Sequence, residues 1–426
     1  MKEKLSKLRN VYQKYGFFGF CKKLYAYVRA NYLDRISFSV WIAPGRYRRE
    51  IRRILEAERY DRVILWRSSF GYQVPLFQRP QHIANALAKS GCLVFYEVTT
   101  MTDRVKKIKK LTDRLYLFNF NNFRLARLLT EELERLACPR YVQLYSTDWK
   151  LSVRDIGAYL DRGFGFVYEY IDHISPELAG TETLPKNISE KYEFVMTHPE
   201  VFVVVTADRL RRDVLRRRGE ARLAVSSNGV DFDFYREFDG SFALDAPFSA
   251  VLARGKPVLM YYGALASWYD YELTKKLAAT GRYSIVLYGI KYDGSFDASG
   301  IGETENVFFL GAKDYRELKY YAKQADLLMI PFLINDITRA TNPVKLFEYM
   351  ALGKPIVTTD MDECRKYASV LIGRDREDFL RKVEQGLSLA DDPAYLATLE
   401  REGRENDWRE KAGAILDLLR ANEPRP

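Results

Sequence analysis

The sequence is poor in the side chains that build metal centres and disulfide frameworks. Among 426 residues there are four cysteines, far apart and without a CxxC pair, and three histidines. A zinc cluster, a disulfide scaffold and a multi-histidine metal centre are therefore not expected, and this cysteine usage fits a reducing cytosol. No run approaches the roughly 18 apolar residues of a membrane-spanning helix, and no signal peptide is recognised.

Positive charge is concentrated at the N-terminus. Lys and Arg outnumber Asp and Glu by 67 to 57, and residues 1–53 hold fourteen of the cations but only three of the acids. Aromatic residues such as Tyr12, Phe17 and Trp41 stand between these cations. We interpret residues 1–58 as a basic, aromatic-rich helical extension.

Two functions of this extension stay open. It can bind an anionic membrane surface through residues 1–53, with its aromatic rings at the level of the headgroups. It can also cover the first domain as a helical hairpin with a solvated basic face. Nucleic acid is not expected as a partner, because no motif for reading bases or phosphates accompanies the charge.

From about residue 60, short apolar runs alternate with amphipathic stretches. Such runs are typical of parallel strands buried on both faces, and the alternation predicts a doubly wound α/β domain. The expected strands are Arg62–Trp66, Val94–Val98, Leu115–Phe118, Tyr141–Tyr145, Phe166–Tyr170, Phe202–Thr206 and Ala224–Ser226. After a break the pattern restarts with Val258–Tyr262, Ser284–Tyr288, Asn306–Leu310, Leu327–Ile330 and Pro355–Thr359.

This pattern predicts two Rossmann-like domains that face a cleft. We place the domains at residues 59–235 and 257–405, with a linker at 236–256 and a C-terminal helix and tail at 406–426. Ligands of such sheets bind beyond the carboxyl ends of the strands, so we expect the functional residues to follow the strands.

The strongest local signal is TNPVKLFEYMALGKP at residues 341–355. It predicts a helix that begins near Pro343, with Asn342 as its N-cap, and stops at Gly353. The free N–H groups of Val344 and Lys345, the helix dipole and the Lys345 ammonium would form an anion site suited to a diphosphate.

Glu348 lies one helical turn after Lys345, and its two oxygens suit a pair of vicinal hydroxyls, such as those of a ribose. The alternative is an ordinary capped helix with a surface Lys345–Glu348 pair. Gly263, without a Cβ atom, would let the backbone approach a phosphate, or simply form a tight turn after a strand.

Further candidates follow the strands of the first domain. Asp172 and His173 stand at an expected strand end, where His173 can orient or deprotonate an acceptor hydroxyl or be a plain surface residue. Arg79 can reach the cleft or form a structural ion pair. His82 and His198 are interpreted as structural, and Asn228-Gly229 as shaping a turn. The DxD tripeptides at 231–233 and 360–362 are too short to indicate a metal site, so no metal is expected.

Six segments resemble, in the same order, the motifs of GT-B-fold glycosyltransferases of the family 4 type, and in particular bacterial envelope-polysaccharide transferases of the teichuronic-acid kind. They are residues 77–84 (FQRPQHIA), 168–173 (YEYIDH), 226–231 (SSNGVD), 262–268 (YGALASW), 309–315 (FLGAKDY) and 341–355. The resemblance spans roughly residues 60–420, and the ordered set is far more specific than any one segment.

The resemblance implies a retaining, metal-independent, hexosyltransferase-type enzyme without a cofactor. Its first domain would bind the acceptor and its second the nucleoside-diphosphate sugar, with a UDP-sugar as the default. The acceptor would be a lipid-linked or envelope glycan, and the enzyme would be cytoplasmic, peripheral at the inner face of the membrane. The implied donor-binding residues are Gly263, Ala264, Asn342, Val344, Lys345 and Glu348; the catalytic residues are Asp172, His173, Arg339 and Lys345; the acceptor or cleft residues are Arg79 and Gln81.

One position departs from the family. In the family's Glu-x7-Glu pattern the first Glu contacts the donor sugar, and here that position is Ala340. Asp336, Thr338, Arg339 or the backbone nearby would have to replace it, and Arg339 would suit a sugar that carries its own negative charge. A nucleotide-sugar epimerase of the same fold and a non-catalytic nucleotide-binding scaffold remain as alternatives.

Overall fold

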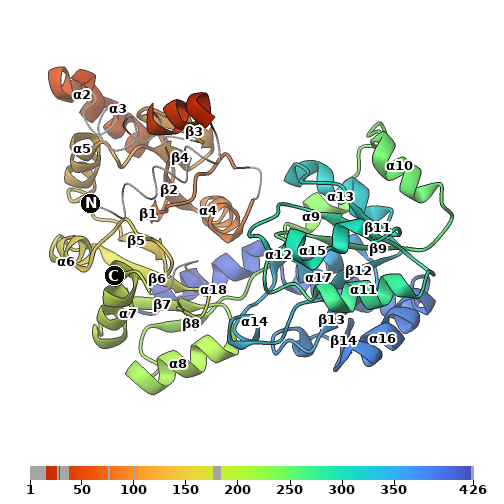
Figure 1. The fold of residues 1–426 in the computed structure, drawn as a ribbon. Coiled ribbons are helices and arrows are strands. Elements are labelled where there is room, and N and C mark those ends of the chain that lie inside the picture. Colours follow the sequence, from red (N-terminus) through yellow and green to blue (C-terminus); the bar gives the residue numbers. More distant parts are fainter. Residues whose placement is uncertain are drawn as a thin grey trace. The chain divides into compact units, whose positions relative to one another are not determined.

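A computed structural model describes residues 16–25, 28, 38–74, 77–99, 102–175 and 184–423. The chain divides into two compact units (Figure 1). One consists of Met1–Val74 and Leu87–Val167, and the other of Pro75–Ala86 and Tyr168–Pro426. Strands and helices alternate along both, as the sequence pattern predicts.

The first sheet has eight strands in the order β3-β4-β2-β1-β5-β6-β7-β8. Strands β4, β2, β1 and β5 pair in parallel, and β3 pairs with β4 antiparallel. The strands are β1 (Arg62–Arg67), β2 (Cys92–Glu97), β3 (Ile108–Thr112), β4 (Leu115–Phe118), β5 (Arg140–Tyr145), β6 (Gly165–Tyr170), β7 (Phe202–Val205) and β8 (Leu223–Val225).

The second sheet has six parallel strands in the order β11-β10-β9-β12-β13-β14. The strands are β9 (Val258–Tyr262), β10 (Ser284–Tyr288), β11 (Val307–Phe309), β12 (Leu327–Ile330), β13 (Ile356–Thr359) and β14 (Val370–Gly373). Counted from β9, this is the order 3-2-1-4-5-6 of dinucleotide-binding sheets, which reverses between β9 and β12. Ligands bind at such a reversal, so the chain just after β9 and β12 is where a site is expected.

Every strand expected from the sequence is present, and the two that were not expected, β3 and β14, lie at the edges of the sheets. Strand β3 reads IKKLT and its side chains are largely exposed. Lysines protect an edge strand from pairing with other chains, and they also remove the apolar run by which buried strands are recognised.

Part of the predicted N-terminal extension forms helices α2 (Phe38–Ile42) and α3 (Pro44–Ala57). Helix α3 buries Tyr47, Ile51 and Leu55 and packs against α5 (Phe123–Leu133). Arg52 forms an ion pair of 2.6 Å with Glu132 of α5. Residues 16–25 are also helical, while the other residues of the extension before Phe38, apart from residue 28, lie outside the described residues. Helix α3 therefore covers the first unit, as one of the two interpretations of the extension requires.

The stretch expected as a linker contains secondary structure. Helices α9 (Phe232–Arg236) and α10 (Ala246–Leu252) lie in or beside it. Phe248 and Val251 of α10 are buried in the hydrophobic core around the second sheet. Both helices therefore pack into the core around the second sheet and do not form an extended linker.

The chain's last helix returns to the SSNGVD segment. The N–H of Val230 donates to the carbonyl of Asn406 over 2.9 Å, and the N–H of Trp408 donates to the carbonyl of Val230 over 3.0 Å. A Cβ atom on Gly229 would stand 2.4 Å from the Asn406 carbonyl oxygen, so only glycine fits this approach. Residues 226–230 are thus held by the start of helix α18 (Trp408–Arg420).

The remaining helices connect or flank the strands. They are α4 (Arg79–Lys89), α6 (Val153–Asp161), α7 (Lys186–Thr197), α8 (Asp208–Arg218), α11 (Tyr271–Ala279), α12 (Ser295–Ser299), η3 (Ile301–Glu303), α13 (Tyr315–Lys323), α14 (Asp336–Arg339), α15 (Val344–Leu352), η4 (Cys364–Lys366), α16 (Arg376–Ser388) and α17 (Pro393–Glu405). Within the described residues, no helix combines the length and the apolar character needed to cross a bilayer.

Candidate functional site

Gly263 follows β9 directly, at the reversal of the strand order. Its φ of +144° is a conformation that side-chain-bearing residues rarely adopt. A Cβ atom here would lie 2.2 Å from Cε and 2.8 Å from Nζ of Lys345. The missing side chain is therefore what allows the Lys345 ammonium to rest on the backbone at the end of β9.

Two further glycines, Gly289 and Gly311, follow β10 and β11 as Gly263 follows β9. Gly263 donates its N–H to the carbonyl of Tyr288 over 2.9 Å, and Gly289 donates to the carbonyl of Gly311 over 2.8 Å. Gly289 has a φ of +142°, and a Cβ atom there would stand 1.7 Å from the Gly263 carbonyl oxygen. Gly289 was not predicted, although a glycine immediately after an apolar run is a signal that could have identified it.

Helix α15 begins at Val344, and its N-cap is Pro343 rather than the predicted Asn342. The reason is that the Asn342 amide has other partners. Its oxygen accepts the N–H of Asn228 over 2.9 Å, and its nitrogen donates to the buried Glu363 carboxylate over 3.1 Å. Asn342 thus joins the start of α15 to the SSNGVD segment. The predicted stop at Gly353 is confirmed, with φ and ψ in the left-handed region.

Lys345 lies in the first turn of α15 and is half-buried. Its ammonium stands 5.6 Å from the ring centre of Tyr261 and 5.7 Å from that of Phe332, which follows β12. Burial lowers the pKa of Lys345, with only a partial opposing effect of Glu348. Among the described residues, no carboxylate lies within ion-pairing distance of this ammonium, so the alternative of a surface Lys345–Glu348 pair is not formed. A desolvated cation without a counter-ion is an attractive position for a bound anion.

Glu348, one turn further along α15, is only 6% exposed. Burial raises the pKa of its carboxyl group, while the hydroxyls of Tyr262 and Tyr235 and the Lys345 ammonium act in the opposite direction. Tyr262 ends β9 and Tyr235 belongs to α9. Neither tyrosine could be predicted from the sequence, because nothing in the pattern around them marks them as neighbours of Glu348.

The segment at the missing first Glu forms α14, and Ala340 there is fully buried. The Thr338 hydroxyl already donates to the backbone carbonyl of Leu333 over 2.6 Å. Asp336 is exposed and forms an ion pair of 2.8 Å with Arg209. Arg339 has only a long contact of 3.4 Å with Asp362. Of the three side chains considered as replacements, Arg339 is therefore the one least bound to the protein.

Asp172 and His173 follow β6, as predicted. Burial raises the pKa of Asp172 to about 6. Arg209 lowers the pKa of Asp336, and His173 contributes to the same effect. The start of α8 therefore meets the start of α14 at Asp336, and His173 lies near enough to affect the pKa of Asp336.

Arg79 and Gln81 are both buried in α4. The Arg79 guanidinium forms an ion pair of 2.6 Å with Glu169 and donates to the carbonyl of Ser227 over 2.8 Å. The Gln81 side-chain oxygen accepts the N–H of Gln78 over 3.2 Å. The structural interpretation of Arg79 therefore fits these contacts. Ala264 contributes its carbonyl, which accepts the Tyr261 hydroxyl over 2.9 Å.

The DxD carboxylates have structural partners. Asp231 caps α9 by accepting the N–H of Phe234 over 3.2 Å, and Asp360 forms an ion pair of 2.6 Å with Arg365. In the part of the chain that the structure describes, no group of three or more His, Cys, Asp and Glu side chains is arranged to hold a metal ion.

Solved structures with the same architecture are GT-B proteins. Trehalose-6-phosphate enzyme from E. coli bound with UDP-2-fluoro glucose aligns with a TM-score of 0.60 at 13% identity, over 85% of this chain and 100% of that chain. HepE of Anabaena in complex with UDP gives 0.56 at 14% identity, over 85% and 100%. Sucrose-phosphate synthase of Thermosynechococcus elongatus gives 0.56 at 14% identity, over 85% and 98%. The fold predicted from the sequence, two sheets of mostly parallel strands of the GT-B class, is confirmed.

The sequence comparisons agree with this class. Residues 256–388, which include Gly263 and Lys345, match the model of the family described as Glycosyl transferases group 1. The chain is also 24% identical over 217 residues to TuaH of Bacillus subtilis (strain 168), whose name assigns it to teichuronic acid biosynthesis as a glycosyltransferase. This match covers 48% of the chain and 53% of TuaH, so the aligned part spans about half the length of that relative.

Proposed function

We propose that the protein is a retaining glycosyltransferase that moves a sugar from a nucleoside-diphosphate donor to a lipid-linked or envelope glycan. The observation that carries the proposal is the Lys345 ammonium, which is desolvated, has no counter-ion among the described residues and lies on Gly263 at the reversal of the strand order. A diphosphate there would receive the ammonium together with the N–H groups that begin α15.

These groups would act on the leaving group. As the bond between sugar and diphosphate breaks, negative charge grows on the diphosphate, and fixed donors stabilise that charge without reorganising. Lys345, the start of α15 and the weakly bound Arg339 would supply them. We further propose that these fixed positive groups act without a metal ion, as the resemblance to family 4 transferases implies.

Asp172 and His173 would act on the acceptor. A carboxyl group with a pKa of about 6 is ionised at neutral pH and close enough to the operating pH to accept a proton from a hydroxyl. His173 would orient the same hydroxyl. The epimerase and scaffold alternatives have no comparable observation in their favour.

A thermal-shift panel tests the donor site. We expect one of the UDP-, GDP-, dTDP- and CDP-sugars to stabilise the protein, by roughly 2.7 kcal/mol at 100 times its dissociation constant. Uridine is the first choice, because HepE and the E. coli enzyme carry UDP or a UDP-sugar. A chain that none of the four stabilises has no donor site of this kind. Incubating the bound donor without an acceptor then separates transfer from epimerisation.

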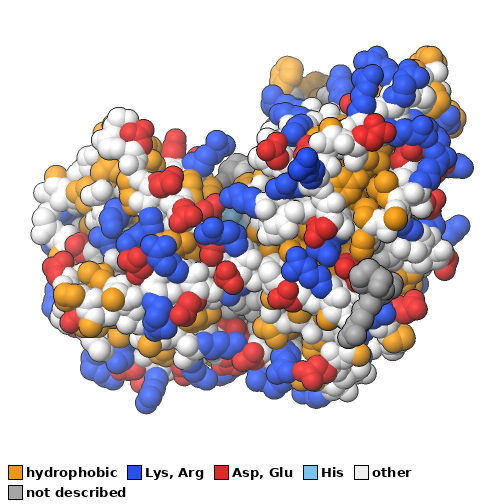
Figure 2. All heavy atoms as spheres, turned by 180° about the vertical axis from the view of Figure 1, so that it is seen from behind, with side chains coloured by type: hydrophobic (Ala, Val, Ile, Leu, Met, Phe, Trp, Pro, Cys, Tyr) orange, Lys and Arg blue, Asp and Glu red, His pale blue; other side chains and the backbone are white. Residues whose placement is uncertain are grey.

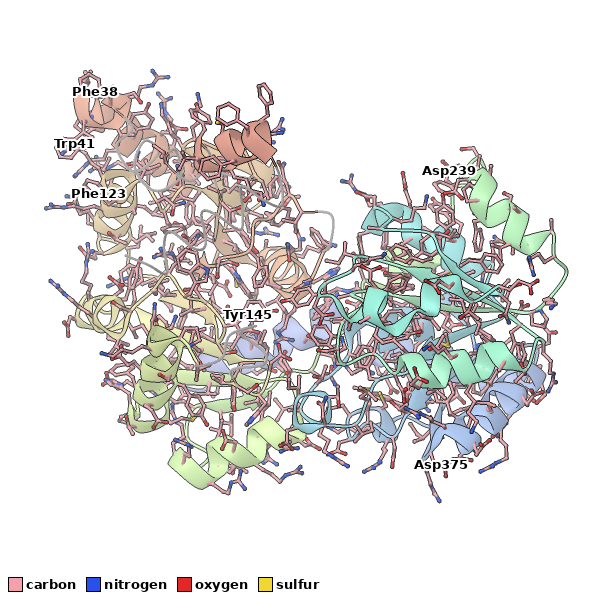
Figure 3. The ribbon with its side chains drawn as sticks, in the orientation of Figure 1. Phe38, Trp41, Phe123, Tyr145, Asp239 and Asp375 are labelled. Atoms are coloured by element: carbon pink, nitrogen blue, oxygen red, sulfur yellow. The ribbon has the colours of Figure 1, made fainter. Side chains whose placement is uncertain are left out.

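We also propose that the first unit docks on an anionic membrane. Four large apolar side chains are exposed on α2 and α5, by 45–74% of their area: Phe38, Trp41, Ile42 and Phe123. Phe38, Trp41 and Phe123 lie together at the outer edge of the view in Figure 3. Figure 2 shows hydrophobic and basic side chains mixed at its upper right, the side on which α2 and α3 lie. Aromatic residues among cations suit the headgroup region of a bilayer.

The double substitution Phe38→Ser/Ile42→Ser should weaken binding to vesicles that contain phosphatidylglycerol. It removes exposed apolar groups and leaves the buried face of α3 intact, which deletion of residues 1–53 would not. Trp149→Ser is the control, because Trp149 is 62% exposed elsewhere in the same unit. Sedimentation is the measurement, and binding should fade as salt shortens the Debye length from about 10 Å at 0.1 M to 3 Å at 1 M. Equal binding to phosphatidylcholine vesicles would contradict the proposal.

A further inference from the structure

A groove of about 380 Å³ lies between α5 and α6 of the first unit (Figure 1). This volume is within the range of sites that hold small ligands. All its lining residues belong to the first unit, whereas Gly263 and Lys345 belong to the other, so the proposed donor site does not use it. The charged side chains that line the groove are four cations and one carboxylate: Arg67, Arg127, Lys150, Arg162 and Asp155.

Two of the cations are held in place by a buried carboxylate. Glu97 is 1% exposed, and it accepts from Nε of Arg67 over 3.0 Å and from Nζ of Lys150 over 3.1 Å. Arg67 also donates to the Tyr159 hydroxyl over 2.8 Å, and Lys150 donates to the carbonyl of Ser68 over 3.1 Å. Both cations therefore have fixed positions before any ligand arrives.

The same two side chains keep donors for a ligand. A guanidinium has five N–H groups and an ammonium three. In the part of the chain that the structure describes, Nη2 of Arg67 and one ammonium proton of Lys150 make no hydrogen bond. Burial opposes the charge of Arg67, but Glu97 and Tyr159 outweigh this effect and the pKa of Arg67 is raised, so it stays a cation. Fixed, charged donors of this kind bind the oxygens of an anion strongly.

The one carboxylate among the lining residues is already bonded. Asp155 accepts the N–H of Ser152 over 2.9 Å and the Ser152 hydroxyl over 2.7 Å, which closes the start of α6. Arg127 and Arg162 form ion pairs with Glu131 and Glu134, and neither of these acids lines the groove. An anion in the groove would therefore meet N–H donors rather than unbonded carboxylate oxygens.

Apolar side chains line the groove beside the cations. The Arg67 guanidinium lies over the Phe120 ring, 4.5 Å from its centre. Phe123 is 55% exposed and meets Trp41 of α2 edge-on, with ring centres 6.2 Å apart (Figure 3). Phe123 thus belongs both to the groove and to the exposed apolar side chains of α2 and α5. This combination suits a ligand with an anionic group and an apolar part.

We propose that the groove holds the phosphate-bearing headgroup of an anionic membrane lipid, with Arg67 and Lys150 as donors to the phosphate oxygens. The apolar walls would contact the first carbons of the lipid chains. The inference rests on the proposed docking of the first unit, because that docking brings lipid to Phe123. It adds a bound lipid of definite stoichiometry to an attraction that would otherwise be diffuse.

Calorimetry with the full chain and monomeric dihexanoylphosphatidylglycerol tests the inference. We expect one lipid to bind per chain, at least tenfold more tightly than glycerophosphoglycerol, the same headgroup without chains. Burial of about two methylene groups suffices for this factor. Dihexanoylphosphatidylcholine, with equal chains but a headgroup of no net charge, should bind at least tenfold more weakly. Glycerophosphoglycerol or inorganic phosphate that binds as tightly as the lipid would make this a site for free phosphate and overturn the proposal.

Ala158→Glu is the blocking variant. Ala158 lies on the exposed side of α6 and lines the groove, so glutamate adds a negative charge and bulk there without removing a contact. Gly157→Glu is the matched control: it adds the same charge to the same helix, does not line the groove, and its Cβ atom would meet nothing within 4 Å. We expect Ala158→Glu to weaken binding of the short-chain lipid at least tenfold, and Gly157→Glu to leave it within twofold.

Lys150→Gln separates the role of the cation from simple obstruction. It removes one donor and leaves Glu97 paired with Arg67. Binding of dihexanoylphosphatidylglycerol should weaken about tenfold, and melting temperatures show whether the variant is folded. Wild-type affinity in a folded Lys150→Gln variant would contradict the assignment of the phosphate to this place.

Equal weakening by Ala158→Glu and Gly157→Glu would also overturn the inference, because the attraction would then be diffuse, and it would leave membrane docking standing. A chain that binds the short-chain lipid but does not sediment with phosphatidylglycerol vesicles would contradict the docking alone. A chain that binds neither would contradict both.

Discussion

Replacing Lys345 by methionine will raise the thermal stability of the protein and lower sugar transfer by about two to three orders of magnitude. Stability rises because methionine fills the same space without a desolvated charge, for which the described part of the chain provides no counter-ion. Transfer falls because, in the proposed donor site, the diphosphate loses the cation that would stabilise its growing charge. The two measurements are the melting temperature and the turnover of the donor identified by the nucleotide panel.

The pH dependence of the stability gain has a definite sign. The pKa of Lys345 is lowered in the folded protein, so the cost of keeping its proton is complete below that pKa. As pH rises towards the ordinary lysine value, the folded wild type loses the proton and the advantage of methionine shrinks. Lys354→Met is the control: burial lowers the pKa of Lys354 too, but it follows the other end of α15. The Lys354→Met variant should gain stability and keep full activity. If the Lys345→Met variant is just as active, the diphosphate does not bind at Lys345.

Substituting alanine for Gly289 will destabilise the protein by about 3 kcal/mol or more, since backbone strain and steric overlap each cost about 1–3 kcal/mol. The new Cβ atom would stand 1.7 Å from the Gly263 carbonyl oxygen, and a backbone atom cannot turn away as a side chain can. The strand ends must separate, and that movement displaces Gly263 from Lys345. Denaturant unfolding measures the loss, and donor binding should weaken in the fraction that stays folded.

Gly281→Ala is the matched control for this substitution. Gly281 also has a positive φ, of +67°, but nothing lies within 4 Å of the position of its Cβ atom. It should lose about 1–2 kcal/mol, which is the strain of the left-handed conformation alone. If both substitutions lower the free energy of unfolding equally, the ends of β9 and β10 separate without an energetic penalty. Gly289 then has no part in holding the site.

Local signals predicted the strands and the helix that carry the candidate site. Gly353 ends α15 where its left-handed conformation requires glycine, and the apolar runs located β9 and β12, although the order in which the strands pair came only from the structure. Asn342 shows the limit of such signals: its type favours an N-cap, but tertiary partners, Asn228 and Glu363, occupy its amide. The phenols near Glu348 could not be predicted, because Tyr235 of α9 and Tyr262 of β9 belong to different elements and come near Glu348 only in the folded protein.

The return of the C-terminal chain to residues 226–230 bears on the order in which the protein is made. The carbonyl of Asn406, the N–H of Trp408 and the carbonyl of Lys411 hold this segment, and the segment holds Asn342 at the start of α15. These partners follow the segment by about 180 residues of sequence, whereas domains generally fold as their chain emerges during translation. The start of α15 therefore gains this support only after residues 406–411 have been synthesised, and a chain truncated before Asn406 would keep the strands of both sheets but lose the contacts that hold residues 226–230.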